Sequence, residues 1–327
     1  GPGSGKTLTI AKRIEYLIMK HKVRPEEILV ITFTKYAAWE MKNRTRSICG
    51  PSSYAVTFGT FHGIYYGILK WAYRLNQSNL LSDEEKYRIL REILPGIDWD
   101  QEPEADEEKD YLQELAIEIG NVKNNCMDIE EYEPVKYTTE KFRKLYRTYE
   151  ETKKKYRKID FEDMLIQCRD LFMKRPDILK KWQEKSQYIL VDEFQDVNQA
   201  QYDVVRMLAA PQDNLFVVGD DDQSVYGFRG AKPGIMMEFM KDYPKARQIL
   251  LDVNYRSSGY IVKGALRVIG NNKIRFEKKI EAFRKPDETV HVQEVKDPVQ
   301  EAEYVLERIR EYREKGVSYT EMAVLYR

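Results

Sequence analysis

Short runs of β-favouring apolar residues recur along the chain, and each ends abruptly in polar or charged residues. The clearest run is Tyr188–Val191, which is followed at once by Asp192 and Glu193. This pattern is typical of a buried parallel strand, which carries polar groups to the carboxyl edge of its sheet, where open α/β sheets bind ligands. Taken alone, the run is equally consistent with a strand that enters an acidic turn. Further strands are predicted at residues 28–31, 55–58, 215–218, 249–258, 288–295 and 323–326.

Between Lys70 and Glu150 the pattern changes to helical spacing, with no predicted strand. Ser82 and Glu85 have the spacing of a capping box, which predicts the start of a helix. The region therefore predicts an all-helical insertion within the α/β layer. Its last helix continues into a basic segment, residues 153–158. These basic side chains could follow nucleic-acid phosphates, or they could be solvated groups beside a packed aromatic face.

After residue 246 the order of strand, helix and strand begins again, with helices predicted up to Ile269 and over Ala302–Arg313. This order predicts the start of a second α/β domain. The chain therefore divides into a first α/β part, a helical insertion, a return to the first α/β part, and the beginning of a second. The predicted boundaries are 1–72, 73–152, 153–246 and 247–327.

Composition limits the class of protein and partner. The chain has 327 residues, enough for two or three domains and a sizeable core. Lys+Arg and Asp+Glu balance at 54 each, so a polyanion must meet a local groove rather than a global positive field. Three scattered cysteines indicate a reducing cytoplasm rather than disulfides or a zinc site. No apolar run approaches membrane-spanning length, so no membrane partner is expected.

The start of the chain matches most of a phosphate-binding P-loop, with the residues Gly1, Pro2, Gly3, Ser4, Gly5, Lys6 and Thr7. Glycines let the backbone turn tightly and aim its N–H groups at phosphate oxygens. Lys6 would place its ammonium on the terminal phosphates, and the Thr7 hydroxyl would ligate Mg²⁺. The next segment has one apolar face at helical spacing, which places the positive end of a helix at the phosphates. The full pattern begins five positions before Gly5, so we expect the natural chain to extend upstream.

Polar and aromatic residues follow two more predicted strands, as Thr32-Phe33-Thr34 and Gly59-Thr60-Phe61-His62. Hydroxyls and an aromatic ring at neighbouring strand ends could hold a nucleic-acid backbone and stack a base. Core packing would explain Phe33 and Phe61 equally well. His62 has no partner at metal-ligand spacing, which favours a role in a turn over ligation.

A second polar strand end follows residues 215–218 and would lie beside the first. It carries Gln223, placed to contact a terminal phosphate, and then Tyr226, Phe228 and Arg229, which would point across the sheet edge. A loop this rich in acids and aromatics costs stability if it has no role, which favours function.

With these residues collected, the sequence resembles the UvrD/Rep/PcrA-type superfamily 1 DNA helicases over nearly its whole length. The resemblance is specific because several motifs occur in the family's order. They are motif I at 1–7, motif Ia at 32–34, 37–38 and 40–42, motif Ib at 60–62, motif II at 191–196, motif III at 219–231 and motif IV at 254–257, with further family counterparts at 160–163 and 323–327.

The resemblance implies a P-loop NTPase (RecA-like) α/β fold, with ATP in the cleft between two RecA-like domains and single-stranded DNA across their top. In that reading Lys6 binds the phosphates, while Thr7 and Asp192 hold Mg²⁺. Glu193 is the general base for the attacking water, and catalysis is mostly positioning and charge neutralisation. Gln223 senses the γ-phosphate.

From the second domain, Tyr255 would stack on adenine and Arg256 would reach the γ-phosphate, so that closure completes the site. The residues that the resemblance assigns to DNA are Phe33, Thr60, His62, Tyr226, Phe228 and Arg229, with the three aromatic rings as stacking platforms and Arg229 as a backbone contact. Each stacked base contributes about 1–3 kcal/mol with little sequence preference, which suits stepping.

The chain departs from the family pattern at a few positions. Lys35-Tyr36 stands where the family has Asn-Lys, Phe228 replaces the usual Trp, and Gly227 replaces a larger side chain. These changes concern the affinity for DNA rather than the hydrolysis of ATP. The upstream glutamine motif and the downstream motifs V and VI are not in the sequence. Since an arginine finger contributes roughly 10³–10⁵ in rate, we expect these 327 residues to bind ATP, to hydrolyse it poorly and not to unwind duplex unaided.

The resemblance predicts an ATP-dependent 3′-to-5′ DNA helicase or translocase. One alternative is a binding switch, an ATPase core that clamps nucleic acid or a partner within a repair or defence complex without unwinding. Another is the helicase part of an AddA/RecB-like helicase–nuclease. DNA-stimulated ATPase followed by strand displacement separates the motor from the switch.

Overall fold

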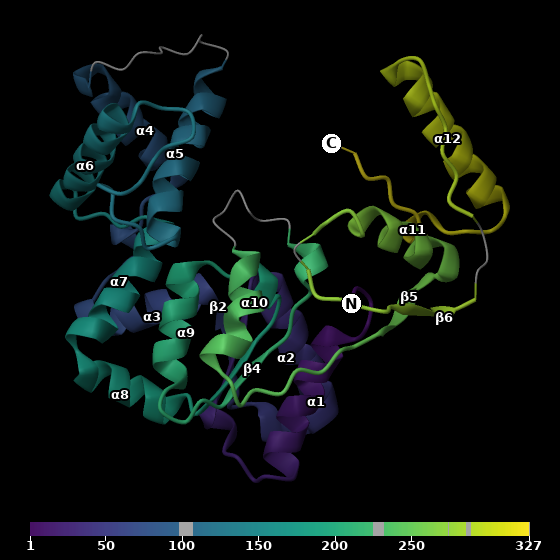
Figure 1. The fold of residues 1–327 in the computed structure, drawn as a ribbon, viewed down its shortest axis with the longest axis horizontal. Coiled ribbons are helices and arrows are strands. Elements are labelled where there is room, and N and C mark those ends of the chain that lie inside the picture. The colour runs from purple at the N-terminus through teal and green to yellow at the C-terminus, as the bar shows by residue number, and fades with distance from the viewer. Residues whose placement is uncertain (98–106, 225–231, 274, 286–288, 327) are drawn as a thin grey trace.

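The structure is a computed structural model that describes residues 1–97, 107–224, 232–273, 275–285 and 289–326. A four-stranded parallel sheet lies at its centre, in the order β2-β1-β3-β4 (Figure 1). The strands are β1 (Ile28–Thr32), β2 (Thr57–Thr60), β3 (Tyr188–Val191) and β4 (Leu215–Val217). The predicted parallel α/β sheet is therefore confirmed. The second strand begins two residues later than predicted, at Thr57, and the fourth ends one residue earlier, at Val217.

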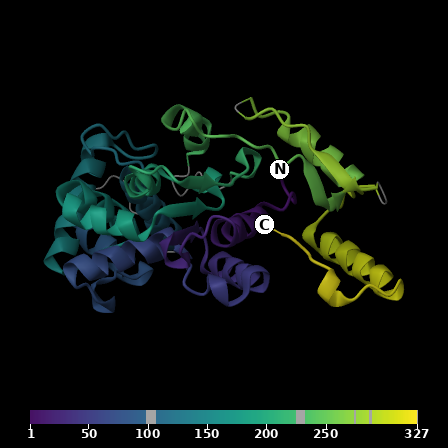
Figure 2. The ribbon, with the colours of Figure 1, turned by 90° about the horizontal axis from the view of Figure 1, so that it is seen from below.

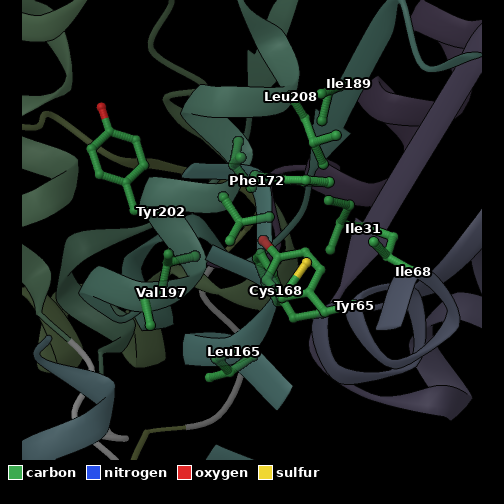
Figure 3. Close-up of a cluster of buried hydrophobic side chains, with 14 of the residues drawn as sticks. Ile31, Tyr65, Ile68, Leu165, Cys168, Phe172, Ile189, Val197, Tyr202 and Leu208 are labelled. Carbon is green, nitrogen blue, oxygen red and sulfur yellow. The ribbon is translucent and has the colours of Figure 1, made fainter. Parts of the chain in front are cut away.

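The sheet has an apolar core on each face because successive side chains of a strand point to opposite sides. In β1, Leu29 and Ile31 belong to one buried cluster, whereas Ile28 and Val30 belong to the other. Residues of the first cluster come also from α3 (Phe61–Tyr73), α7 (Phe161–Lys174) and α9 (Gln199–Ala209), as Figure 3 shows in part. The second cluster includes buried residues of α1 (Lys6–Met19) and α2 (Lys35–Cys49).

Two further helices complete this part of the chain, α8 (Pro176–Lys185) and α10 (Pro233–Asp242). The predicted apolar face of the first helix is confirmed, since its four residues are all buried: Ile10, Ile14, Leu17 and Ile18. Burial of a side chain of this size contributes about 1.5–3 kcal/mol, so this face anchors the segment that follows the glycine-rich turn.

The helical insertion has a hydrophobic cluster of its own, drawn from residues 81–149. Its helices are α4 (Asp83–Ile93), α5 (Glu108–Asn124) and α6 (Thr139–Lys155). The predicted capping box is present, because the amide of Glu85 donates to Ser82 Oγ and the amide of Ser82 donates to a Glu85 carboxylate oxygen. Before the basic segment, α6 has the packed aromatic face that one alternative expected, since Phe142 and Tyr149 are fully buried.

A buried cluster of charges joins the insertion to the α/β part. Lys153, expected to be solvated or to meet phosphate, instead lies inside the protein and contacts Asp160 and Asp163. Lys123 of α5 contacts the same two carboxylates. Asp160 also caps α7, because its side chain accepts the amide of Asp163. The insertion is thus held at the first turn of a core helix.

The last part of the chain contains a two-stranded parallel sheet of β5 (Val253–Ser258) and β6 (Glu281–Arg284), with α11 (Gly259–Ile269) and α12 (Pro298–Glu314). In both views, α12 lies at the end of the molecule remote from the helical insertion (Figures 1 and 2). The predicted helices over 302–313 and up to Ile269 are confirmed.

The strand predicted at residues 249–258 is confirmed over its second half, where β5 covers residues 253–258. Two other predicted strands of this part are wrong, because the described residues 289–295 and residues 323–326 have no strand. The sequence pattern also gave no indication of β6. Ile249 is 72% exposed and Leu325 is 95% exposed, so these apolar side chains have no neighbouring strand to cover them within the described ranges. An alternating run becomes a strand only where another strand pairs with it. Among the described residues, no helix has the length and apolar character to cross a membrane.

Candidate nucleotide and nucleic-acid site

The glycine-rich turn leads directly into α1. Gly3 and Gly5 have φ values of 61° and 83°, in the left-handed region that favours glycine, and Gly5 is the residue that caps the helix. No described side chain caps this end. The amides of the first helical turn therefore point toward the turn without a side-chain acceptor, which is the arrangement that helices use to bind anions.

Lys6, the first residue of α1, places its ammonium between two carboxylates. Its Nζ lies 3.8 Å from Glu193 Oε2 and 3.9 Å from Asp220 Oδ2, which is beyond hydrogen-bond distance. This nitrogen is buried and makes no hydrogen bond within the described residues. A buried ammonium without a hydrogen-bond acceptor is costly, and phosphate oxygens of a nucleotide would satisfy it. The residues present therefore fit a nucleoside triphosphate.

Asp192 and Glu193 stand at the carboxyl end of β3. The amide of Asp192 donates to Ile31 O at 3.0 Å, so the sheet pairing extends to the acidic pair. Burial raises the pKa of Asp192 to about 6, and the neighbouring Glu193 adds to the shift. A cation beside this carboxylate would favour its charged form, and its oxygens are ligands that Mg²⁺ prefers. Thr7, the proposed second ligand, stands in the first turn of α1 next to Lys6.

Gln195 connects the paired acids to the next strand end, a role that the sequence pattern did not reveal. Its Nε2 donates to Glu193 Oε2 at 3.0 Å, and its Oε1 accepts the amide of Asp220 at 2.9 Å. A Cβ on Gly219 would lie 2.8 Å from this Oε1, so glycine permits the close approach. The only sequence signal was the position of Gln195 two residues after Glu193, which does not identify its partners.

Gln223, the predicted phosphate sensor, lies at the same edge of the sheet. Its Nε2 donates to Asp220 Oδ2 at 2.6 Å. Burial alone would raise the pKa of Asp220, but hydrogen bonds from Lys278 and Gln223 outweigh it and lower that pKa. Asp220 is therefore an ionised group that contacts the predicted sensor and lies close to Lys6.

The last part of the chain touches the glycine-rich turn through β5. Asn254 Nδ2 donates to Pro2 O at 2.8 Å, and the amide of Tyr255 donates to Gly3 O at 3.0 Å. The structure thus brings Tyr255 and Arg256 to the turn, as the resemblance implies. The Tyr255 side chain is exposed and its ring centroid lies 5.2 Å from that of Phe283. The backbone contact made by Asn254 was not predicted.

Three residues expected to bind DNA lie at the ends of β1 and β2. Thr60 pairs in register with Thr32 and caps α3 by accepting the amide of Gly63. Phe33 follows β1, is half-buried and makes a T-shaped contact with Phe61, with ring centroids 6.0 Å apart. His62 does not stand in a turn. It lies in the first turn of α3, and its ring packs against Phe161. Tyr226, Phe228 and Arg229 lie outside the described residues.

The architecture first gives the class of protein. A parallel α/β sheet whose first helix begins at a glycine-rich turn is the architecture of a P-loop protein with a RecA-like domain. Comparison with family models then gives the family. The model for the UvrD/REP helicase N-terminal domain matches residues 1–244, and that for the UvrD-like helicase C-terminal domain matches residues 249–327. The chain belongs to the UvrD/REP helicase family.

Curated relatives agree with this assignment. All of the chain aligns with the putative ATP-dependent DNA helicase YjcD of Bacillus subtilis (strain 168), at 38% identity and over 43% of that protein's length. The ATP-dependent DNA helicase PcrA of Staphylococcus aureus (strain Mu50) is 35% identical, again with all of the chain covered and with 45% of the relative. The chain thus spans less than half the length of these relatives.

Proposed function

We propose that the chain forms the nucleotide-binding half of an ATP-dependent DNA helicase that moves 3′ to 5′ along single-stranded DNA. The observation that carries this proposal is the position of the Lys6 ammonium, buried and without a hydrogen bond, between Glu193 and Asp220. A terminal phosphate placed there would meet the lysine, the amides of α1 and the acidic end of β3 together. Membership of the UvrD/REP helicase family supports this reading.

Each side chain has a specific task in the proposed hydrolysis. Lys6 binds the β- and γ-phosphates, and Thr7 and Asp192 hold Mg²⁺, which would neutralise charge on the transferring phosphoryl group. Glu193 accepts the proton of the attacking water. Gln195 donates to Glu193 Oε2, the oxygen that lies 3.8 Å from Lys6 Nζ, and would thereby fix the orientation of the carboxylate. These tasks are positioning and charge neutralisation, which dominate phosphoryl transfer.

The second part of the chain completes the site across the cleft. Tyr255 would stack on adenine, and Arg256 would contact the γ-phosphate. The hydrogen bonds that Asn254 and Tyr255 make to the glycine-rich turn support this arrangement. We propose residues 1–72 and 153–246 as one RecA-like domain, 73–152 as its helical insertion, and 247–327 as the start of a second.

Single-stranded DNA would cross the carboxyl edge of the sheet. Phe33, Thr60 and His62 would contribute from β1, β2 and α3, and Tyr226, Phe228 and Arg229 from the loop after Gln223. The common edge formed by Thr32 and Thr60 supports this path. Stacking on aromatic rings tolerates any base, as translocation requires.

Calorimetry of the chain with Mg·ATP tests the nucleotide site. We expect saturable binding by the unmodified chain and a loss of at least tenfold in affinity in Lys6→Ala, with Lys12→Ala as the control because Lys12 is an exposed lysine of the same helix. Absence of heat with the folded, unmodified chain would reject the proposal. On the complete protein, DNA-stimulated ATPase with strand displacement supports a motor, whereas stimulation without displacement supports a switch.

A further inference from the structure

Three consecutive aspartates follow β4, and a lysine from the last part of the chain occupies their centre. The carboxylates of Asp220, Asp221 and Asp222 lie close enough together to hold a metal ion. Lys278 Nζ lies 2.6 Å from Asp220 Oδ1 and 3.0 Å from Asp222 Oδ2, and it also contacts Asp221. Because an ammonium already contacts all three carboxylates, these acids make an ion-pair centre rather than a cation site.

This centre is buried. The Asp220 side chain is 0% exposed and that of Lys278 is 4% exposed. Ionised groups shielded from water in this way require partners, since an unpaired buried charge costs several kcal/mol. The same segment makes a second ion pair, in which an Arg275 nitrogen lies 2.7 Å from Asp222 Oδ2, the oxygen that Lys278 also contacts. In the described part of the chain, Arg275 pairs with Asp222 and not with Asp220.

Asp220 connects Lys278 to two residues of the proposed site through hydrogen bonds. One of its carboxylate oxygens accepts from Lys278, and the other accepts from Gln223 Nε2. Its amide donates to Gln195, which in turn donates to Glu193. A continuous set of hydrogen bonds therefore runs from Lys278 to the proposed phosphate sensor and to the proposed general base.

We propose that Lys278 is a positioning residue for recognition of the terminal phosphate, acting through Asp220 on Gln223 and, through Gln195, on Glu193. The proposal rests on the proposed function, since it requires that Gln223 contacts the γ-phosphate. It adds a residue from the second part of the chain that orients the sensor without touching nucleotide.

Loss of Lys278 has a defined electrostatic consequence. Asp220 would keep its buried charge, and the cations of the described residues that remain within 4.0 Å would be Lys6 and the amino group of Gly1, each now 3.9 Å away. The carboxylate would then compete with phosphate for Lys6 and release Gln223 from its present orientation. The contribution of the γ-phosphate to binding affinity should fall most, because Gln223 is assigned to that phosphate alone.

The test compares Mg·ATP with Mg·ADP, each titrated calorimetrically into the unmodified chain, Lys278→Met, Lys278→Arg and Arg275→Met. Circular dichroism and a thermal melt establish that each variant is folded. We expect Lys278→Met to lose at least tenfold in ATP affinity and less than threefold in ADP affinity. Lys278→Arg should retain the ATP-to-ADP ratio within about threefold, because a guanidinium can still pair with Asp220.

Arg275→Met tests whether Lys278 positions Asp220 or only attaches the last part of the chain to the first. If Lys278 only holds the two parts together, Arg275→Met and Lys278→Met should change the ratio alike, and that result would overturn the proposal. An unchanged ratio in folded Lys278→Met, or a ratio of one in the unmodified chain, would also overturn it. Failure of the unmodified chain to bind either nucleotide would instead reject the proposed function itself.

A second variant removes the risk that an excess of buried negative charge unfolds Lys278→Met. Lys278→Met combined with Asp222→Asn restores the charge balance but leaves Asp220 without its lysine. This double variant should still lose at least tenfold in ATP affinity relative to ADP. A ratio equal to that of Asp222→Asn alone would show that Lys278 does not act through Asp220.

Discussion

Lys153 Nζ lies 2.7 Å from Asp160 Oδ2, and both side chains are almost completely excluded from solvent. Lys153 lies in the last turn of α6, and Asp160 caps the next helix, α7. Burial alone would raise the pKa of Asp160, but Lys123 and Lys153 outweigh it and hold that pKa well below its ordinary value. Asp160 therefore stays ionised where the helical insertion meets the α/β part.

Breaking this pair should destabilise the protein strongly. Removal of one partner of a buried ion pair leaves an uncompensated charge, which costs about 3–5 kcal/mol. We expect Lys153→Met to lower the free energy of unfolding by this amount in denaturant titrations. Lys154→Met is the matched control, because Lys154 is exposed and its loss should change stability by less than about 0.5 kcal/mol. Equal effects of the two substitutions would contradict the structural role of Lys153.

Nucleotide binding with Mg²⁺ should weaken in acid through Asp192. The pKa of this carboxyl is raised to about 6, so it is protonated below that pH and cannot ligate the cation. We expect the affinity for Mg·ATP to fall by up to tenfold for each pH unit below about 6 in calorimetric titrations. Asp192→Asn should bind weakly and show no such dependence between pH 5 and 7. The same steep loss in Asp192→Asn would assign the titration to another group.

The same shift predicts a pH dependence of stability without nucleotide. Because the folded pKa of Asp192 lies above the value of 3.8 for an unperturbed carboxyl, ionisation favours the unfolded state. The stability that the protonated form contributes is present below about pH 4 and is lost as the pH rises through about 6. Asp192→Asn should therefore be more stable than the unmodified chain at pH 8, by about 1–3 kcal/mol, in denaturant titrations. Equal stability at pH 8 would show that the carboxyl is not destabilised by burial.

Substitution of the proposed general base should separate binding from turnover. Glu193→Gln retains size and hydrogen bonding but cannot accept a proton, so the complete protein should bind ATP with unchanged affinity. Its ATPase rate should fall by at least 10², within the range that general bases contribute. Single-turnover hydrolysis with labelled ATP measures this, with the exposed Glu184→Gln as control. Retained turnover would exclude Glu193 as the base.

Loss of an aromatic side chain that stacks on a base should weaken DNA binding without changing the ATPase rate measured in the absence of DNA. Phe228→Ala removes a stacked base worth about 1–3 kcal/mol, so affinity for a single-stranded oligonucleotide should fall by roughly 5–150-fold. Fluorescence anisotropy measures the affinity, and ATPase without DNA measures the chemistry. Tyr54→Ala removes another aromatic ring, one that is exposed and lies beside Arg46, and serves as the control. A parallel fall in basal ATPase would mark Phe228 as a packing residue.

Local patterns predicted those features that depend on neighbouring residues in the sequence. A glycine-rich turn before an amphipathic segment predicts a helix with free amides, and an apolar run before Asp192 predicts a buried strand end. Both are present. The predictions failed where a strand depends on a distant partner. Residues 323–326 have strand-like composition, yet no strand in the described part of the chain pairs with them, whereas β5 and β6 pair with each other across more than twenty residues.

The sequence by itself determined the family, the parallel sheet and the proposed nucleotide-site residues Lys6, Asp192 and Glu193, because backbone conformation and hydrophobic periodicity are encoded locally. Tertiary structure alone decided that Gln195 joins Glu193 to Asp220 and that Lys278, 58 residues farther along the chain, neutralises Asp220. Such contacts depend on how separate elements pack. Many charged residues could pair with a buried aspartate, and only the folded arrangement selects which one reaches it.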